Sequence, residues 1–173
     1  MAAKALEFLS VLSPSFSLAP DEASSVVALM RVVHYGAGAT LFKAGDENSG
    51  YMLLVLEGNI AVDTGSAGSG QSAEISTLGP SALIGELALL DGSPRSATCT
   101  AVTNVVAAGF PAAGLQRLLE THPLVAAKLA IYIAQTASER LRALTDQLQM
   151  YGQITASMQQ EIDQLRLAAK HNH

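Results

Sequence analysis

Residues 84–98 bring a glycine, an acid and an arginine into one short segment, Ile-Gly-Glu-Leu-Ala-Leu-Leu-Asp-Gly-Ser-Pro-Arg-Ser-Ala-Thr. Gly85 permits backbone torsions and a close approach that a Cβ would forbid. Residues 87–90 favour a short helical turn, whose first N–H groups have no partner within the helix and form an anion site. Arg95 adds a planar fork of donors that matches two phosphate oxygens at once. The segment therefore predicts that a phosphate is bound.

Glu86 lies beside this predicted anion site, where it would repel a phosphate. An ionised carboxylate only accepts hydrogen bonds, which suits a sugar hydroxyl held near the phosphate. Residues 91–94 are typical of a turn that brings Arg95 back over the helix start, and the small residues Ser96 and Ala97 allow the backbone to approach a ligand. A ligand that offers both a phosphate and a hydroxyl is a nucleotide. The competing interpretation is a surface salt bridge between Glu86 and Arg95, which would contribute little.

The same segment resembles the phosphate-binding cassette of the cyclic-nucleotide-binding domain family, which includes the bacterial catabolite activator protein and the regulatory subunits of protein kinase A. The family pattern is matched here by Ile84, Gly85, Glu86, Leu87, Ala88, Leu89, Arg95, Ser96 and Ala97. The resemblance implies that Glu86 accepts from the ribose 2′-hydroxyl. It also implies that Arg95 neutralises the cyclic phosphate, together with N–H groups near residues 87–88 and 96–97.

Further segments extend the resemblance to roughly residues 20–150, because residues 35–46 and 52–62 resemble the family's opening strands and central hairpin. Ile75, Ser76 and Leu78 lie at the expected distance before Gly85 to line the base pocket, although ordinary strand core explains them equally well. In the catabolite activator group a long helix closes over the purine, which implies contacts from Leu144 or Thr145. A Ser after the arginine is typical of cAMP sites, and its hydroxyl leaves cGMP open.

Composition narrows the class of protein. The chain has 173 residues, enough for one domain with a real core, and 49% of them are hydrophobic. A net charge of −5 with only 10 Lys and Arg disfavours a broad electrostatic contact with DNA. The single cysteine excludes an internal disulfide and is typical of a reducing compartment. Polar residues interrupt the apolar residues 1–20, which excludes a signal peptide, and no apolar run could span a bilayer, so we expect a cytoplasmic protein.

The elements that must position the cassette fall into three zones. Residues of about 3–33 are predicted to be helical. The middle zone contains short strand-like runs separated by Gly, Ser, Pro and Asn, at residues 52–56, 60–63, 73–78 and 98–108. Such runs imply a barrel or sandwich. Residues 65–70 are predicted as a flexible hairpin loop, because neither a Lys-Ser/Thr pair nor a helix follows them.

The third zone is predicted to contain a short helix over 112–120 and a long one after Thr121, which would cap it, with Pro123 in its first turn. Apolar positions at alternating spacings of three and four form a heptad seam. It comprises Leu141, Leu144, Leu148, Tyr151, Met158, Ile162 and Leu165, with polar Thr155 between them. A parallel homodimer through this seam is favoured over a flexible C-terminal tail. The family resemblance also implies a dimer.

We therefore predict a mainly β fold with flanking helices: a double-stranded, jelly-roll-like β-roll followed by a long C-terminal helix. The predicted domains are residues 1–136, the nucleotide-binding roll with its N-terminal helices, and residues 137–173, the helix that serves as lid and dimerisation coiled coil. The predicted function is that of a sensor of a cyclic nucleotide, with cAMP expected ahead of cGMP, which signals to a separate effector protein by moving the long helix.

Catalysis has little support in the sequence. The four histidines are scattered without an acid or cysteine at ligand spacing, and no nucleophile elbow or Walker loop is present, so no enzyme, metal site or cofactor is expected. Two alternatives remain. One is a homodimeric adaptor whose roll no longer binds nucleotide. The other is a transcriptional regulator that lacks its own DNA-binding domain, since no second domain follows the long helix; Met1 favours a native start.

Overall fold

The computed structural model describes residues 1–11, 17–47, 50–65 and 75–171. Nearly all of the loop expected at residues 65–70 and the first two residues of the strand expected at 73–78 lie outside this described part. The chain forms two compact units, Met1–Ile133 and Ala134–His173. The predicted division at residue 136 also assigned functions to the two parts, and it stays a prediction.

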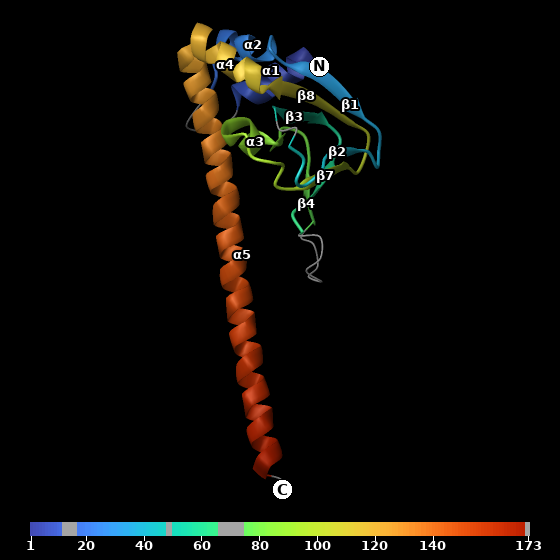
Figure 1. Ribbon diagram of the computed structural model, residues 1–173, viewed down its shortest axis with the longest axis vertical. Coiled ribbons are helices and arrows are strands. Elements are labelled where there is room, and N and C mark those ends of the chain that lie inside the picture. Colours follow the sequence, from blue (N-terminus) through green and yellow to red (C-terminus); the bar gives the residue numbers. More distant parts are fainter. Residues whose placement is uncertain (12–16, 48–49, 66–74, 172–173) are drawn as a thin grey trace. The chain divides into compact units, whose positions relative to one another are not determined.

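The strands of the first unit build a roll from two antiparallel sheets (Figure 1). Within the described residues the sheets have the strand orders β1-β8-β3-β6 and β2-β7-β4-β5. The strands are β1 (Arg31–Tyr35), β2 (Thr40–Phe42), β3 (Tyr51–Glu57), β4 (Ile60–Asp63), β5 (Ile75–Leu78), β6 (Leu83–Ile84), β7 (Thr98–Ala101) and β8 (Val105–Pro111). This arrangement confirms the predicted β-roll.

Strand β3 explains how the roll is stabilised, because its central residues are buried on both faces. Side chains alternate along a strand, so Leu53 and Val55 enter the cluster between the two sheets. Met52, Leu54 and Leu56 enter a second cluster, which also contains side chains of the flanking helices. The uninterrupted apolar run from Met52 to Leu56 is therefore what a strand packed on both sides requires.

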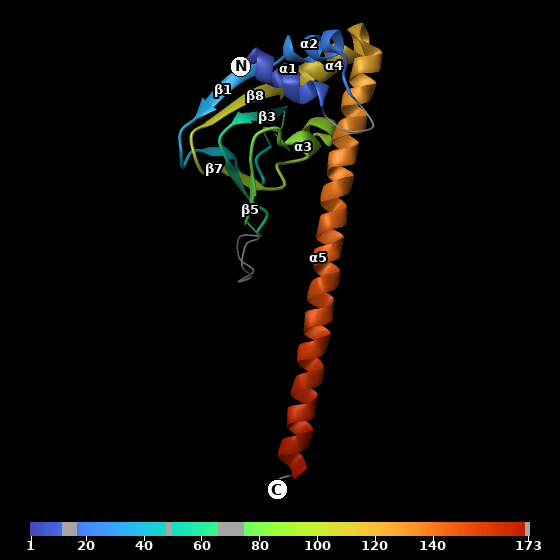
Figure 2. The same cartoon turned by 180° about the vertical axis from the view of Figure 1, so that it is seen from behind.

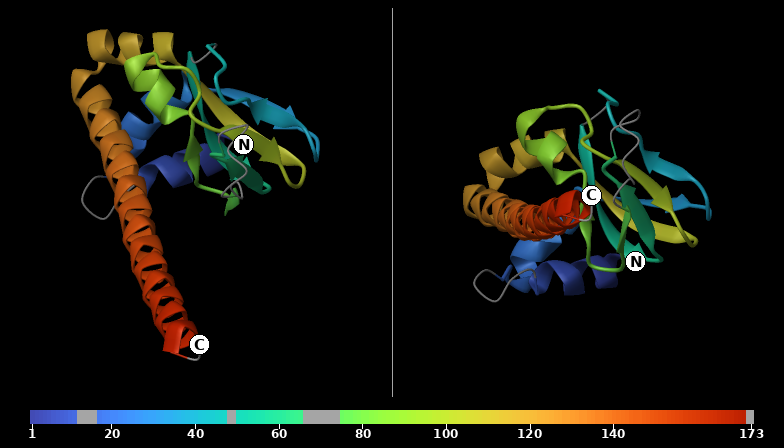
Figure 3. Two further views of the ribbon diagram at one scale, coloured as in Figure 1. Left: turned by 60° about the horizontal axis from the view of Figure 1, so that its bottom comes forward. Right: turned by 90° about the horizontal axis from the view of Figure 1, so that it is seen from below.

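That second cluster contains side chains of α1 (Ala2–Ser10), α2 (Pro20–Val27), α4 (Ala112–Thr121) and the start of α5 (Pro123–His171), together with Leu89 of the short helix α3 (Glu86–Asp91). Figures 2 and 3 show α1, α2 and α4 gathered beside β8 and β3. In α2, the Glu22 carboxylate accepts a hydrogen bond from Ala19 N–H at 2.8 Å, and the carboxylate also bonds Lys128 Nζ at 2.7 Å. This pair ties α2 to the first turns of α5.

Three local predictions need correction. The helical zone expected to reach residue 33 ends at Val27, because Arg31 already pairs with Gly109 of β8. The run expected at 98–108 is two strands, β7 and β8, separated by residues 102–104. Thr121 is not a helix cap: it is the last residue of α4, and its Oγ1 donates to Arg117 O at 2.8 Å.

Helix α5 is continuous over 49 residues, as Figure 1 shows, and it confirms the predicted long helix. Within Ala134–His173 the seam positions are exposed to solvent in the single chain: Leu141 65%, Leu144 49%, Leu148 71%, Tyr151 56%, Met158 59% and Ile162 43%. The side chain of Leu165 lies outside the described part. No helix in the described part of the chain is both long and apolar enough to cross a membrane.

Candidate functional site

The predicted cassette begins where strand β6 ends. Gly85 follows with a φ of 73° and is the N-cap of α3 (Glu86–Asp91), so the short helix starts one residue before the predicted turn. A Cβ on Gly85 would collide with Nη1 of Arg95 and would lie 3.0 Å from carbons of the Phe42 ring. The glycine is therefore required both by the backbone conformation and by the close approach of the arginine.

Arg95 is buried, with 4% of its surface exposed. Residues 91–94 return the chain so that Arg95 Nη1 donates to Gly85 O at 3.0 Å, while Nη2 donates to Tyr51 O at 2.7 Å. The backbone is held as well, because Arg95 N–H donates to Asp46 O at 3.0 Å and Arg95 O accepts from Gly45 N–H at 2.8 Å. The β2–β3 connection thus anchors the residue that carries the charge.

Two aromatic rings complete the surroundings of this guanidinium. Its central carbon lies 3.8 Å from the centroid of the Phe42 ring and 4.9 Å from that of the Tyr51 ring. Neither residue was predicted from the sequence as part of the site. The sequence offered only a weak indication of their role. Phe42 ends β2 and Tyr51 begins β3, both before the cassette, and aromatic residues are rare in this chain, which has only 4 Phe and 4 Tyr.

The electrostatics of the site follow from its burial. Desolvation lowers the pKa of the Arg95 guanidinium below its ordinary value, and nearby Tyr51, Cys99, Asp46 and Glu86 offset this only in part. The group still stays protonated, because arginine is effectively always charged in proteins. Among the described residues, its Nε donor is buried and has no acceptor. The result is a fixed, buried cation whose Nε nitrogen has no hydrogen-bond partner among the described residues.

Glu86 is the first residue of α3, and its side chain is 1% exposed. A carboxylate in the first turn of a helix is stabilised by the N–H groups there. Since both Glu86 and Arg95 are buried, the competing interpretation of an exposed salt bridge is wrong. The structure therefore brings Gly85, Glu86 and Arg95 together, as the order of the cassette predicts.

The other residues predicted to bind the ligand differ in how far they are buried. Ala88 is buried, Leu87 is 42% exposed, Ser96 is exposed and Ala97 is half-buried. Leu78 is half-buried and packs against the cluster between the sheets, which is what its alternative role as strand core requires. Ser76 is exposed.

Three further candidates are placed by their backbones. Ile75 pairs with Asp63 across β4 and β5, and its side chain lies outside the described part. Leu144 is 49% exposed, and Thr145 Oγ1 donates to Leu141 O at 2.9 Å. Both belong to the unit Ala134–His173, so the roles inferred for them remain predictions.

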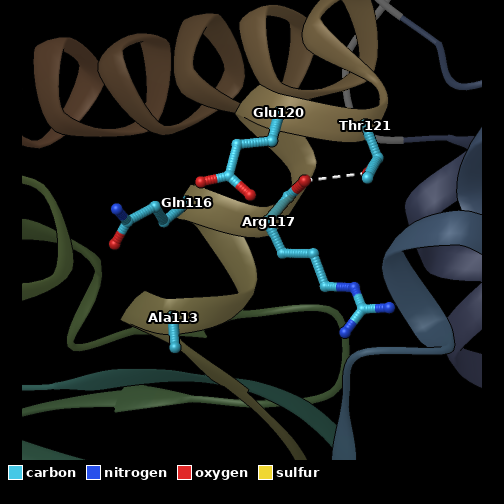
Figure 4. Close-up of a pocket in the computed structure, with 5 residues that line it drawn as sticks. All are labelled: Ala113, Gln116, Arg117, Glu120 and Thr121. Atoms are coloured by element: carbon cyan, nitrogen blue, oxygen red, sulfur yellow. Dashed lines mark hydrogen bonds between the residues drawn. The ribbon is translucent and has the colours of Figure 1, made fainter.

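A separate hollow of about 440 Å³ lies on α4, lined by Ala113, Gln116, Arg117, Glu120 and Thr121 (Figure 4). None of these residues belongs to the cassette. The Arg117 guanidinium points away from the Glu120 carboxylate, so the hollow does not combine them into one site. Within the described residues, no cluster of three or more His, Cys, Asp or Glu is arranged to hold a metal ion.

Comparison with known proteins places this geometry in context. A family model described as the cyclic nucleotide-binding domain matches residues 32–122. A cyclic nucleotide-gated potassium channel of Mesorhizobium japonicum is 33% identical over 71% of this chain and 31% of its own length. The cyclic AMP receptor protein of Thermus thermophilus is 32% identical over 73% of this chain and 58% of its own. The chain thus spans less than two thirds of the length of these curated relatives.

Solved structures lead to the same fold. A cyclic nucleotide-binding domain from Methylobacillus flagellatus superposes with a TM-score of 0.74 at 26% identity, covering 82% of this chain and 78% of that one. The Thermus thermophilus catabolite activator protein gives a TM-score of 0.63 at 29% identity, covering 73% and 59%.

Proposed function

The chain belongs to the cyclic nucleotide-binding domain family, and from that premise we propose that it binds a cyclic nucleotide, cAMP ahead of cGMP, at the cassette around Arg95. The observation that carries the proposal is the buried Arg95 guanidinium, whose Nε donor has no acceptor among the described residues. A buried cation with a nitrogen that has no acceptor favours an anion beside it. The Thermus thermophilus relative is named a cyclic AMP receptor protein, which supports cAMP as the ligand.

In this proposal the cyclic phosphate binds at Arg95 and at N–H groups near residues 87–88 and 96–97. A singly charged phosphodiester suits the Arg95 guanidinium, which carries one positive charge. Glu86 accepts a hydrogen bond from the ribose 2′-hydroxyl, because an ionised carboxylate cannot donate. Its burial removes competing water and makes that bond more specific.

The base contacts are proposed from the two units separately. Ile75 and Leu78 would line the base on the roll, and Leu144 or Thr145 would close over the purine. The exposed hydroxyl of Ser96 leaves room for a contact with a guanine, so cGMP is retained as the second ligand. Helix α5 would transmit the signal if the ligand has different affinities for two arrangements of that helix, since tight binding alone shifts no equilibrium.

We further propose that Ala134–His173 forms a parallel homodimer. Its seam side chains from Leu141 to Ile162 are between 43% and 71% exposed in the single chain, although they repeat with the heptad spacing of a coiled coil. A long amphipathic helix gains most of its stability from packing its apolar stripe against another surface. A second copy of the same helix offers a stripe of matching period.

The proposed role is binding and regulation, with no catalytic step, and the proposed partner in signalling is an effector protein. A cytoplasmic location is proposed from the single cysteine, which cannot form an intramolecular disulfide and is buried on β7. Such cysteine usage is typical of reducing compartments.

Thermal unfolding with excess cAMP, cGMP or 5′-AMP tests this function. A ligand at about 100 times its Kd stabilises the folded state by about 2.7 kcal/mol, which raises the Tm by about 5–10 °C for a chain of this size. The rise should occur with cAMP, vanish in Arg95→Ala and persist in Arg117→Ala, which removes an exposed arginine on α4. No rise with either cyclic nucleotide would refute the function and favour the adaptor alternative.

A further inference from the structure

We propose that Phe42 and Tyr51 form an aromatic clamp, a pair of positioning residues that hold the Arg95 guanidinium flat so that its Nε edge faces the bound phosphate. The proposal rests on the proposed function and deepens it, because it assigns part of the ligand affinity to two residues outside the cassette.

The clamp acts first on the flat faces of the guanidinium. Aromatic faces attract cations electrostatically when the charge lies within about 6 Å of the ring centroid. The Arg95 carbon lies 3.8 Å from the Phe42 centroid and 4.9 Å from that of Tyr51. The two rings also contact each other, with centroids 5.4 Å apart and planes tilted by 49°, so each ring limits the movement of the other.

Backbone carbonyls then fix the orientation of the guanidinium within its plane. Nη1 donates to Gly85 O and Nη2 donates to Tyr51 O, so Tyr51 contributes both its ring and its carbonyl. The rings thus cover the faces of the guanidinium, and the carbonyl oxygens bind its two terminal nitrogens. Nε remains as a buried donor without an acceptor among the described residues. A guanidinium held in this way cannot turn toward water, and its unused donor keeps one direction.

The chemistry of the clamp preserves the positive charge. A carboxylate partner would neutralise Arg95 and would compete with an incoming phosphate. Ring faces and carbonyl oxygens stabilise the cation without a negative charge of their own, so the clamp itself does not compete with the phosphate. Preorganised donors of this kind increase affinity because less ordering is needed on binding.

Two neighbours show that the clamp is closely packed. Gly85 leaves space that a Cβ would take from both Arg95 and the Phe42 ring. Tyr35 on β1 and Tyr51 both pack against the cluster between the two sheets. Phe42 is itself 5% exposed, so the clamp is continuous with the core between the sheets.

The test measures the cAMP affinity of the whole chain by titration calorimetry, below the unfolding temperature of each variant. Phe42→Leu and Tyr51→Leu should each weaken binding about tenfold, the effect of losing one desolvated cation–π contact. Tyr51→Phe keeps the ring and should restore affinity to within about threefold of wild type. Phe110→Leu makes the same change in the other cluster, where Phe110 is fully buried, and should leave affinity within the same limit.

Two results would overturn the clamp: near-wild-type affinity of both Leu variants, or a Tyr51→Phe variant as weak as Tyr51→Leu. A second measurement needs no ligand. In a double-mutant cycle of Phe42→Leu with Arg95→Met, the clamp requires that the two losses of unfolding midpoint do not add, whereas additive losses would contradict it. If the wild type binds neither nucleotide, the proposed function fails by itself and this ligand-free cycle decides the clamp.

Discussion

Gly85→Ala and Gly92→Ala are a matched pair of substitutions that separates backbone strain from the collision at the site. Both glycines flank α3 and both have left-handed backbones, with φ of 73° and 70°. A Cβ on Gly92 would meet nothing within 4 Å, whereas a Cβ on Gly85 would collide with Arg95 Nη1 and lie 3.0 Å from Phe42 ring carbons. Only the second substitution must displace the guanidinium.

The expected magnitudes follow from these contacts. A left-handed alanine costs about 1–2 kcal/mol, so each variant should lose about 2–8 °C of Tm at this chain length. Gly85→Ala should also lose the hydrogen bond from Nη1 to the residue 85 carbonyl and part of the contact with Phe42. These add about 1–3 kcal/mol, and the cAMP affinity should fall at least about tenfold because Arg95 is displaced.

The assay combines thermal unfolding without ligand and titration calorimetry with cAMP, on both variants and the wild type. We expect Gly92→Ala to bind within about threefold of wild type while losing stability from strain alone. If Gly85→Ala matched Gly92→Ala in both stability and affinity, the guanidinium would not need its observed position, and the reasoning about the site would be refuted.

Four further changes test other parts of the structure. Arg95→Ala should weaken cAMP binding by about 2–5 kcal/mol, as when a buried charge loses its partner; calorimetry that finds wild-type affinity would contradict the phosphate role. Ser96→Thr should shift the ratio of cGMP to cAMP affinity upward, measured by competition, and an unchanged ratio would exclude Ser96 from base recognition. Leu148→Glu, at a seam position that is 71% exposed in the single chain, should convert a dimer to a monomer in light scattering, since a buried charge is costly, and a persistent dimer would exclude the seam. Lys128 and the Ala19 N–H lower the pKa of Glu22, so the stability they contribute is present above the unfolded-state pKa and is lost as the pH falls through the folded-state pKa. Lys128→Met should therefore lose less stability than wild type between about pH 6 and pH 3 in denaturant titrations, and equal losses would show that the pair does not contribute.

Much of the fold was predictable because its strands and its long helix follow from local sequence patterns. Short apolar runs separated by breakers indicated strands, and a long segment without proline, interrupted by one glycine, indicated α5, which the structure confirms. The errors fell where tertiary pairing overrides local propensity. Residues 31–33 were included in the predicted helical zone but pair with β8, and Thr121 was predicted as a cap but is the last residue of α4.

The residues of the site likewise include some that short spacing predicted and some that only the tertiary structure brought there. Gly85, Glu86 and Arg95 are at most ten positions apart, so turn chemistry alone predicted that they meet, and Arg95 Nη1 does reach Gly85 O. Phe42 and Tyr51 precede Arg95 by more than forty positions. Their contact with it depends on how β2 and β3 are placed in the two sheets, and no local pattern encodes that placement.

The sequence by itself therefore determined the family, the order of the cassette and the elements of the roll, because these depend on residue type and short spacing. Only the tertiary structure decided that Glu86 and Arg95 are buried rather than paired at the surface, and that aromatic faces and carbonyl oxygens surround the guanidinium. The physical reason is that burial and ring stacking arise from contacts between distant segments. Those contacts exist only after the two sheets have packed around their common core.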